Sequence, residues 1–336
     1  SGFPWRCPDA TSGPGALGGE PPERYPVTAY KAAVIRGDGV GVEVIEEGLK
    51  VLQAVEERYG VASEFTEFPW GSDYYFENGR MMPADGLDRL AAFDTIFFGA
   101  VGHPDIQDHV TLNGLLLPIR RTFDQYVCER PRVLYPGVTS PLQGRGPGDI
   151  DMSVIRENTE GEYANVGGFQ YMGFSEEIGI QTGIFTRRGC ERVITYAFDL
   201  ARRRDKARHV TSVTKSNAQG YGMLVWDRAF EAVAERYPDI ETRSLLVDAA
   251  CMDFIRRPDS FDVVVASNLF GDILTDIAAI ITGSMGIAPS GNIDPERRFP
   301  SMFEPVHGSA PDITGKGIAN PLAAILSGAM MMRHLG

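Results

Sequence analysis

Short runs of β-branched and aromatic residues alternate along the chain with longer segments of helical periodicity. The run at 31–35 predicts a strand, and a glycine-rich turn then leads into a helix that Gly60 ends. The apolar positions of this helix fall on one face: Val40, Val44, Ile45, Leu49, Leu52 and Val55. We expect further strands at 93–100, 152–156, 209–215, 242–249 and 261–267, and helices at 190–204 and 216–237. The alternation predicts an α/β protein with a mainly parallel sheet.

The first residues of the chain depart from this pattern. Residues 1–26 contain eleven glycines and prolines, so we expect 1–28 to be a flexible extension. They also lack the basic start and apolar run of a secretory signal. The four cysteines are too scattered for a disulfide framework: Cys7, Cys128, Cys190 and Cys251. These features predict reduced thiols and a cytoplasmic protein.

Composition and charge exclude several classes of partner. The 336 residues are enough for about two domains of ordinary size, and 43% apolar with 23% charged residues is typical of a globular protein. A formal net charge of −13 repels phosphate backbones and anionic membranes. The longest apolar segment, 322–332, is shorter than the roughly 20 residues of a membrane helix and predicts a buried helix. We therefore expect neither a nucleic-acid partner nor a membrane.

A glycine-rich turn at 37–41 (GDGVG) separates the first strand from the first helix. The dinucleotide-binding fingerprint would need a third glycine at position 42, where Val42 stands, so a classical Rossmann fold is not predicted. What the motif does predict is a tight strand-to-helix turn, which backbone geometry alone could explain.

Three acidic residues are candidates for binding a metal ion. Asp272 and Asp276 are spaced i and i+4 in the segment 267–276 and therefore share one helical face, where like charges call for a compensating positive group. Asp248 directly follows an apolar strand. A hard cation such as Mg²⁺ or Mn²⁺ prefers oxygen ligands and would suit this set. Solvated helix and loop carboxylates are the alternative interpretation.

Arginines are concentrated locally in this acidic protein, at Arg120, Arg121, Arg130 and Arg156. A guanidinium pairs with a carboxylate through two parallel hydrogen bonds, so arginines on different elements would suit a dicarboxylate substrate. Surface ion pairs are the alternative interpretation for each of them.

The segment 303–312 (FEPVHGSAPD) has the glycines and prolines of a loop. Backbone amides at Gly308, Ser309 and Ala310 could cradle a pyrophosphate. Asp312 could accept hydrogen bonds from an adenosine ribose and would repel a 2′-phosphate. An ordinary turn would explain the same residues.

Together these segments resemble the β-decarboxylating dehydrogenases, the superfamily of isopropylmalate, isocitrate and tartrate dehydrogenases. The resemblance covers roughly residues 30–332 and is strongest in NLFGDILTD (268–276) and FEPVHGSAPDITGKGIANP (303–321). Three further motifs resemble the branch of tartrate dehydrogenase and D-malate dehydrogenase (decarboxylating): WGSDYYFENGRMMPADGL (70–87), FDQY (123–126) and VIRENTEGEY (154–163).

The resemblance implies an NAD-dependent oxidation of a 2-hydroxy dicarboxylate. The resulting 2-oxo acid loses its β-carboxylate as CO₂, and the enolate is then protonated. A divalent metal, Mg²⁺ or Mn²⁺, favours the alkoxide and stabilises the enolate. Relatives also suggest a dependence on K⁺.

The resemblance assigns roles to individual residues. Lys215 matches the lysine that helps to remove the hydroxyl proton, and Tyr163 matches the acid that protonates the enol. The substrate-binding arginines are Arg120, Arg130 and Arg156, and the metal ligands are Asp248, Asp272 and Asp276. The NAD-binding loop is matched by His307, Gly308, Ser309, Ala310, Asp312 and Asn320. Asp312 stands where NADP-using relatives tend to carry lysine, which favours NAD.

The family architecture implies an isopropylmalate dehydrogenase-like fold with two open α/β domains and a cleft between them. Residues 29–125 and 283–336 would form the first, NAD-binding domain. Residues 126–282 would form the second domain, which carries the metal site and the dimer contacts, with an arm near 163–185 that clasps the partner. Family members are homodimers with shared active sites, so Lys215 and Asp248 are expected to serve the other subunit.

The segment 111–117 is expected to face the group on the third substrate carbon. Gly114 and Leu116 offer no donor to a third carboxylate, which disfavours isocitrate. Asn113 stands where this branch often has tryptophan, and Cys128 where asparagine is usual. The branch motifs favour tartrate or D-malate, while the leucines leave 3-isopropylmalate as the alternative.

A non-catalytic regulatory homologue is the alternative of another class, although such chains typically lose one of the five catalytic and metal residues that are present here.

Overall fold

The computed structural model describes residues 29–336, so the predicted extension at 1–28 and Cys7 lie outside the described residues. Its strands are β1 (Ala29–Gly37), β2 (Ala62–Glu67), β3 (Thr95–Ala100), β4 (Val127–Val133), β5 (Asp151–Glu157), β6 (Gly161–Gln170), β7 (Ile178–Ile184), β8 (His209–Thr214), β9 (Glu241–Leu246), β10 (Val263–Ala266), β11 (Pro289–Ile293) and β12 (Ser301–Pro305). Its helices are α1 (Val40–Tyr59), α2 (Ser72–Asn78), α3 (Gly86–Leu90), α4 (Asp108–Thr111), α5 (Leu117–Thr122), α6 (Arg187–Arg204), α7 (Gly222–Ala234), α8 (Val247–Arg256), α9 (Asn268–Ile281) and α10 (Leu322–Leu335). Short turns of other helix types lie at Leu112–Leu116 (η1), Pro258–Ser260 (η2) and Met285–Ile287 (η3).

One ten-stranded sheet runs through the molecule in the order β2-β1-β3-β12-β11-β4-β5-β10-β8-β9. Neighbouring strands are parallel except at β12-β11, β11-β4 and β4-β5. The prediction of a mainly parallel α/β sheet is therefore confirmed. The two open sheets that the family architecture implies are joined edge to edge here, because β11 and β4 pair and leave neither strand with an unpaired edge.

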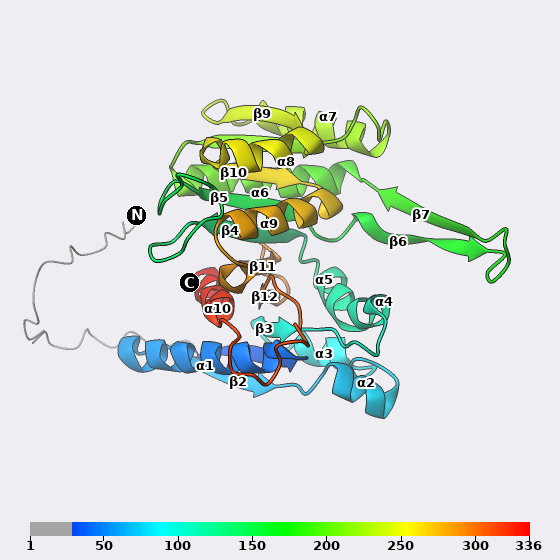
Figure 1. The fold of residues 1–336 in the computed structure, drawn as a ribbon, viewed down its shortest axis with the longest axis vertical. Coiled ribbons are helices and arrows are strands. Elements are labelled where there is room, and N and C mark those ends of the chain that lie inside the picture. The colour runs from blue at the N-terminus through cyan, green and yellow to red at the C-terminus, as the bar shows by residue number, and fades with distance from the viewer. Residues whose placement is uncertain (1–28) are drawn as a thin grey trace, which may run out of the picture.

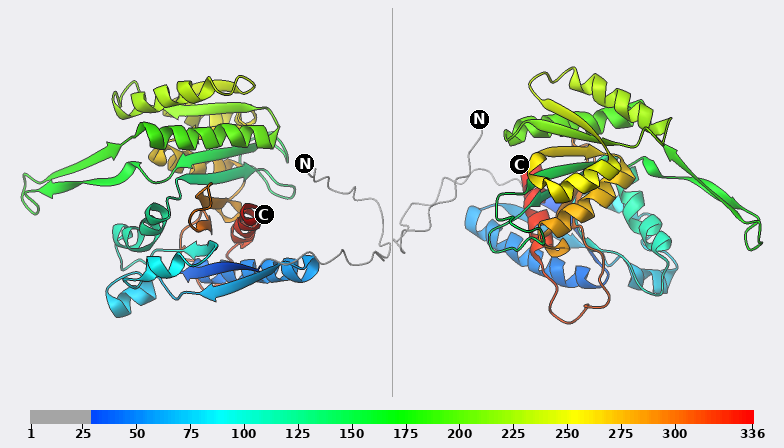
Figure 2. Two further views of the ribbon diagram at one scale, coloured as in Figure 1. Left: turned by 180° about the vertical axis from the view of Figure 1, so that it is seen from behind. Right: turned by 45° about the horizontal axis from the view of Figure 1, so that its top comes forward.

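Helices cover both faces of the sheet (Figures 1 and 2). In the half built from β5, β10, β8 and β9, α8 and α9 lie on one face, and α6 and α7 lie on the other. The other half is covered by α1 and α10, which pack against each other. The domain boundaries at 125–126 and 282–283 stay a prediction.

Most expected elements are present within a few residues of their predicted bounds. In α1 the stripe of Val44, Ile45, Leu49 and Leu52 is buried, and Gly60 ends the helix at φ 69° with its N–H bonded to the Glu56 carbonyl. The segment 322–332 is confirmed as part of a helix, α10, whose inner face is buried.

Two expected elements are wrong in their bounds. The strand expected at 242–249 ends at Leu246, and α8 begins at Val247, so Asp248 lies in the first turn of a helix, where the helix dipole favours a carboxylate. The helix expected at 216–237 is shorter, Gly222–Ala234. In the first case the apolar residues Leu245, Leu246 and Val247 run across the junction, so the apolar pattern alone could not locate it.

A second, smaller hydrophobic cluster supports the helices that lead into the site. It includes Phe98 of β3, Leu115 and Leu116 of η1, Ile119 of α5 and Met302 of β12. Because these side chains are buried, the segment 112–122 is held against the ends of β3 and β12.

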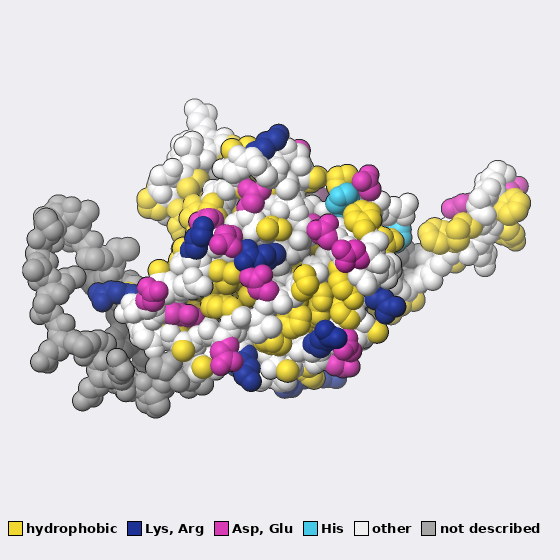
Figure 3. Space-filling view, turned by 90° about the horizontal axis from the view of Figure 1, so that it is seen from below, with side chains coloured by type: hydrophobic (Ala, Val, Ile, Leu, Met, Phe, Trp, Pro, Cys, Tyr) yellow, Lys and Arg dark blue, Asp and Glu magenta, His cyan; other side chains and the backbone are white. Residues whose placement is uncertain are grey.

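The hairpin of β6 and β7 extends away from the body of the molecule (Figures 1 and 2). Apolar side chains lie exposed along it (Figure 3), among them Phe169, Tyr171, Met172, Phe174 and Ile180. Its position matches the arm expected near 163–185, whose clasping of a partner stays a prediction. Within residues 29–336, no helix combines the length and apolar character needed to cross a bilayer.

The glycine-rich turn at 37–41 holds the loop that follows β12. Gly39 has φ 57°, and a Cβ built on it would lie 2.1 Å from the carbonyl oxygen of Ser309. The same carbonyl accepts a hydrogen bond from the Val40 N–H at 2.8 Å. Position 39 therefore requires glycine, because the backbones of the turn at 37–41 and of the loop after β12 are in direct contact there.

Replacing Gly39 with alanine should therefore destabilise the protein by two separate effects. Gly60→Ala is the control, because Gly60 also has a positive φ, 69°, in the αL region, and has open space around its Cβ position. We expect Gly60→Ala to cost about 1 kcal/mol of unfolding free energy. Gly39→Ala should cost about 3 kcal/mol, because a backbone clash and a backbone conformation outside the αL region are added. Urea denaturation of both variants measures the difference, and equal losses would contradict the contact.

Candidate active site

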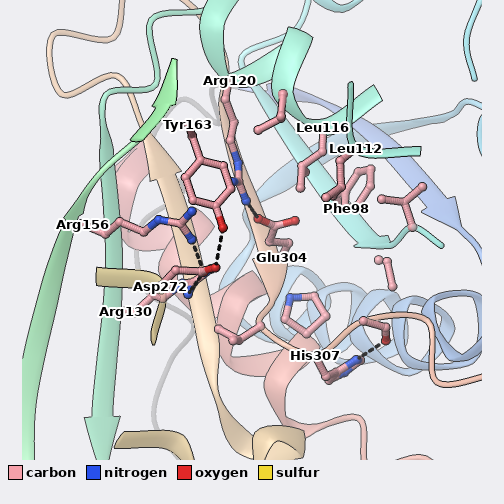
Figure 4. Close-up of a pocket in the computed structure, with 17 residues that line it drawn as sticks. Phe98, Leu112, Leu116, Arg120, Arg130, Arg156, Tyr163, Asp272, Glu304 and His307 are labelled. Carbon is pink, nitrogen blue, oxygen red and sulfur yellow. Dashed lines mark hydrogen bonds and ion pairs between the residues drawn. The ribbon is translucent and has the colours of Figure 1, made fainter. Parts of the chain in front are cut away.

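A cavity of about 190 Å³ opens at the carboxyl ends of β3, β5 and β12 (Figure 4). This edge of an open α/β sheet is where ligands commonly bind. Its polar lining residues come from six elements and from the loop that follows β12: Arg120, Arg130, Arg156, Tyr163, Asp272, Glu304 and His307. Three of the predicted arginines, Tyr163 and Asp272 are thus brought together from distant parts of the chain.

Asp272 is the central carboxylate of the cavity. Its Oδ1 accepts hydrogen bonds from Arg130 Nη1 at 3.1 Å and from Arg156 Nη1, and its Oδ2 accepts one from the Tyr163 hydroxyl at 3.1 Å. Burial by itself would raise the pKa of Asp272, but the charges of Arg156, Arg130 and Arg120 outweigh it and lower that pKa. The positive groups expected to compensate the α9 carboxylates are therefore Arg130 and Arg156.

The pairing of β4 with β5 places the two arginines on one face. Arg130 lies opposite Val154, and Arg156 lies opposite Cys128, so the two side chains are diagonal neighbours. Both are almost fully buried and have further acceptors. Arg130 Nη1 donates to Thr275 Oγ1 at 2.6 Å, and Arg156 Nη2 donates to the Asn268 side-chain oxygen at 2.7 Å.

Arg120 reaches the cavity from α5 and pairs with Glu304 of β12. Arg120 Nη2 donates to Glu304 Oε1 at 2.7 Å, and both side chains are more than nine-tenths buried. The same oxygen accepts a hydrogen bond from Asn292 Nδ2 at 2.7 Å. Arg120 Nε is buried and has no hydrogen-bond partner among the described residues. One donor of the Arg120 guanidinium is therefore not used by the described chain.

Tyr163 is held by both its hydroxyl and its backbone. Burial, followed by the charge of Asp272, raises the pKa of the Tyr163 hydroxyl, which keeps it protonated near neutral pH. The Arg156 guanidinium lies 5.2 Å from the centre of the ring. Arg121 does not line the cavity, but its Nη2 donates to the Tyr163 carbonyl at 2.6 Å.

An apolar wall faces these charged groups. It is formed by Phe98, Leu112, Leu116 and Leu117. Asn113 is exposed, lies outside this wall and donates to the His109 carbonyl at 2.7 Å. Gly114 packs on Met81, whose side chain would lie 2.5 Å from a Cβ, so this glycine has a packing role.

The predicted NAD loop borders the cavity at one end. His307 and Gly308 line it, while Ser309 is buried behind them against the glycine-rich turn. A Cβ on Gly308 would meet nothing within 4 Å, so there is open space beside this backbone for a bound group. The other predicted NAD-binding residues do not line the cavity. Ala310 has φ 41°, and Asp312 and Asn320 are exposed.

The three predicted metal acids do not meet within the described chain. Asp276 is exposed on α9 one turn after Asp272, and partial burial together with the charge of Asp272 raises its pKa. Asp248 is exposed on α8 and accepts a hydrogen bond from Lys215 Nζ at 2.6 Å, which lowers its pKa. Neither Lys215 nor Asp248 lines the cavity, and residues 29–336 contain no group of three or more potential metal ligands.

The sequence pattern of the family described as isocitrate/isopropylmalate dehydrogenase matches residues 31–336. The chain belongs to this family. A probable tartrate dehydrogenase/decarboxylase of Agrobacterium vitis is 55% identical over 308 residues, which are 91% of this chain and 86% of the relative. The D-malate dehydrogenase [decarboxylating] of Escherichia coli strain K12 is 54% identical over 91% of this chain and 85% of its own length.

The fold of the family is confirmed by a solved structure. The crystal structure of isocitrate dehydrogenase from Methylococcus capsulatus superimposes with a TM-score of 0.82 at 35% identity, covering 91% of this chain and 86% of that one. The isopropylmalate dehydrogenase-like fold, and the resemblance to the tartrate and D-malate dehydrogenase branch, are both borne out by these comparisons.

One residue of the cavity lining, Glu304, and one buried arginine outside the lining, Arg132, were not predicted from the sequence. Glu304 belongs to the motif at 303–321, and its signal was an acidic residue between the apolar residues Phe303 and Pro305 of a buried strand. Arg132 lies two residues after Arg130 and is buried, with Nε donating to the Thr275 carbonyl at 3.2 Å. Burial, together with the charge of Arg130, lowers the pKa of Arg132 to about 9.

The Arg120–Glu304 pair should contribute strongly to stability because both charges are buried. We expect Glu304→Gln to lower the unfolding free energy by about 3 kcal/mol, since the Arg120 charge is then buried without its partner. Glu47→Gln breaks an exposed pair with Lys50 and should leave the unfolding free energy nearly unchanged. Denaturation in urea compares the two variants. If both variants lose the same unfolding free energy, Glu304 does not stabilise the buried charge of Arg120.

Proposed function

We propose that this protein is an NAD-dependent, divalent-metal-dependent dehydrogenase that oxidises, and usually decarboxylates, a 2-hydroxy dicarboxylate. The observation that carries the proposal is the convergence of Arg120, Arg130 and Arg156 on one small cavity with Asp272 and Tyr163. Three guanidinium groups face two carboxylates there, and Arg120 Nε lacks a partner among the described residues. The site therefore suits a small anion with more than one carboxylate.

Tartrate and D-malate are the preferred substrates within this class. The names of the relatives support this choice, since a tartrate dehydrogenase/decarboxylase and a D-malate dehydrogenase share more than half of their aligned residues with this chain. The wall of Phe98, Leu112 and Leu116 offers no donor to a third carboxylate. The same wall favours 3-isopropylmalate as the second candidate, because it could contact an isopropyl group.

Asp272 and Asp276 would hold Mg²⁺ or Mn²⁺ together with Asp248 from a second copy of the chain. Carboxylate oxygens are the ligands these ions prefer, and the described chain supplies two at one place. Bound there, the ion would stabilise negative charge on the substrate oxygens. Asp272 would then release Arg130 and Arg156 to the substrate carboxylates.

Two residues are proposed to move protons. The Tyr163 hydroxyl lines the cavity and is protonated near neutral pH, so it can donate a proton to the enolate carbon. Lys215 would take up the proton of the substrate hydroxyl in the partner's site.

NAD would supply the hydride acceptor and would lie along the loop that starts at His307. Gly308 leaves open space beside its backbone, and Asp312 is exposed and could accept hydrogen bonds from a ribose. Its negative charge disfavours a 2′-phosphate, hence NAD over NADP. Ser309, Ala310 and Asn320 complete the proposed loop, and a dependence on K⁺ stays a prediction.

The position of Lys215 and Asp248 supports the proposal of a homodimer with shared sites. They form an exposed pair that does not line the cavity of their own chain. The apolar hairpin of β6 and β7 offers a surface for the second copy (Figure 3). The described cysteines, Cys128, Cys190 and Cys251, are unpaired, which fits the proposed location in the cytoplasm.

The proposal is tested by following NADH formation with D-malate, tartrate, 3-isopropylmalate and isocitrate, each with and without Mn²⁺ and with and without K⁺. We expect turnover of D-malate or tartrate that depends on Mn²⁺, and little with isocitrate. Preference for 3-isopropylmalate would establish the second candidate. A folded dimer that turns over none of the four would favour the non-catalytic regulatory alternative.

Shared sites predict that two inactive variants complement each other. Lys215→Ala and Tyr163→Phe should each lower kcat by about 10²-fold or more, because each removes a proton-transfer group. Mixed dimers refolded from both variants would contain one site with Tyr163 from one chain and Lys215 from the other. We expect the mixture to regain activity that neither parent has. An inactive mixture of folded dimers would show that each chain supplies both groups to its own site.

A further inference from the structure

Glu162 binds the N-terminus of the helix that carries Asp272 and Asp276. Its Oε1 accepts a hydrogen bond from Ser267 Oγ at 2.8 Å, and its Oε2 accepts one from the Leu269 N–H at 3.1 Å. Ser267 is the N-cap residue of α9, but its own side chain does not cap the helix. The Glu162 carboxylate therefore takes the capping role from a neighbouring strand, where its charge also suits the helix dipole.

Successive residues of β6 thus hold α9 at two points. Glu162 contacts the first turn at Leu269, and the Tyr163 hydroxyl contacts Asp272 at 3.1 Å. Leu269 and Asp272 are three residues apart, about 4.5 Å along the helix axis. Because a helix is stiff over one turn, a shift of its N-terminus moves Asp272 relative to Tyr163.

Other contacts join residues 160–163 to the start of α9. Asn268 Nδ2 donates to the Glu160 carbonyl at 3.0 Å, while the Asn268 side-chain oxygen accepts from Arg156. Gly161 adopts φ 72°, and a Cβ on it would lie 3.3 Å from the Asn268 Cβ. On the other side, Arg121 donates to the Tyr163 carbonyl. The Glu162 contact is therefore part of a closely packed junction.

We propose that Glu162 is a positioning residue that sets the distance between the Tyr163 hydroxyl and the Asp272 carboxylate through the N-terminus of α9. Its side chain does not line the cavity, so it would act on the reaction through these two groups. The effect on turnover rests on the proposed function, whereas the geometric claim does not. Displacement of a reacting group by about 1 Å can cost about 10²-fold in rate.

Glu160 provides a matched control in the same segment. Its carboxylate accepts hydrogen bonds from the Thr186 N–H at 2.9 Å and from Thr186 Oγ1, at the N-terminus of α6. Helix α6 contributes no residue to the cavity. Thr186 is the N-cap residue of α6, and its own hydroxyl accepts from the Gly189 N–H. Glu160→Ala therefore removes a carboxylate from a helix N-terminus without touching the site, and the Glu160 carbonyl that binds Asn268 remains.

The test compares Glu162→Ala, Glu162→Gln and Glu160→Ala by thermal unfolding and by steady-state kinetics of NADH formation. Both alanine variants should lower Tm, since each removes a carboxylate that accepts two or more hydrogen bonds at a helix N-terminus. We expect kcat to fall by about 10²-fold in Glu162→Ala, with a smaller change in KM, and to stay near wild type in Glu160→Ala. Glu162→Gln should restore most of kcat, because its amide oxygen can still accept from Leu269. A kcat for Glu162→Ala equal to that of Glu160→Ala would overturn the proposal.

A double variant and a structure separate this inference from the proposed function. If Glu162 acts partly through Tyr163, then Glu162→Ala should slow turnover less in the Tyr163→Phe background than in the wild type, because the tyrosine hydroxyl is already absent there. A crystal structure of Glu162→Ala should show a longer distance between Tyr163 Oη and the Asp272 carboxylate than in the wild type. An unchanged distance would refute the inference whether or not the protein turns over any hydroxy acid. The other case is a wild type that turns over none of the substrates while the distance in Glu162→Ala is longer. That result would refute the proposed function alone.

Discussion

The structure depends on a balance of buried charges around Asp272. Arg130 and Arg156 are almost fully withdrawn from water, and each such charge costs several kcal/mol unless it is paired. Asp272 offsets part of that cost by accepting from both guanidinium groups. Glu304 does the same for Arg120. Three positive groups then face two negative ones, so the cavity keeps an excess of positive charge in a protein whose net charge is −13.

This balance requires both halves of the sheet. Arg120 and Glu304 come from α5 and β12, while Arg130, Arg156 and Asp272 come from β4, β5 and α9. The pairing of β11 with β4 joins the two groups through backbone hydrogen bonds. Because the cavity lies where the two halves meet, a relative shift of the halves would change every distance across it. Such a geometry suits a site that must grip a small anion from several sides.

Acidic residues of the motif at 154–163 bind the backbone and the helices that surround the cavity. Glu157 accepts from the backbone of Thr159 and Glu160, and Glu160 and Glu162 bind the N-termini of α6 and α9. Burial raises the pKa of Glu157, although its hydrogen bonds to Thr159 and Glu160 oppose that shift. A stretch that resembles a family motif thus combines a residue of the cavity, Tyr163, with neighbours that place the surrounding helices.

The sequence by itself determined the α/β architecture, the shared face of Asp272 and Asp276 and, through its motifs, the family. These features are local, because periodicity and motifs involve residues within a few turns of each other. Only the tertiary structure decided that Glu304 neutralises Arg120, that Gly114 packs on Met81, and that Lys215 and Asp248 lie outside the cavity of their own chain. Each of these depends on contacts between segments far apart in the chain. Burial and partner distance decide there what a charge or a glycine does, and neither can be obtained from the spacing of residues along the sequence.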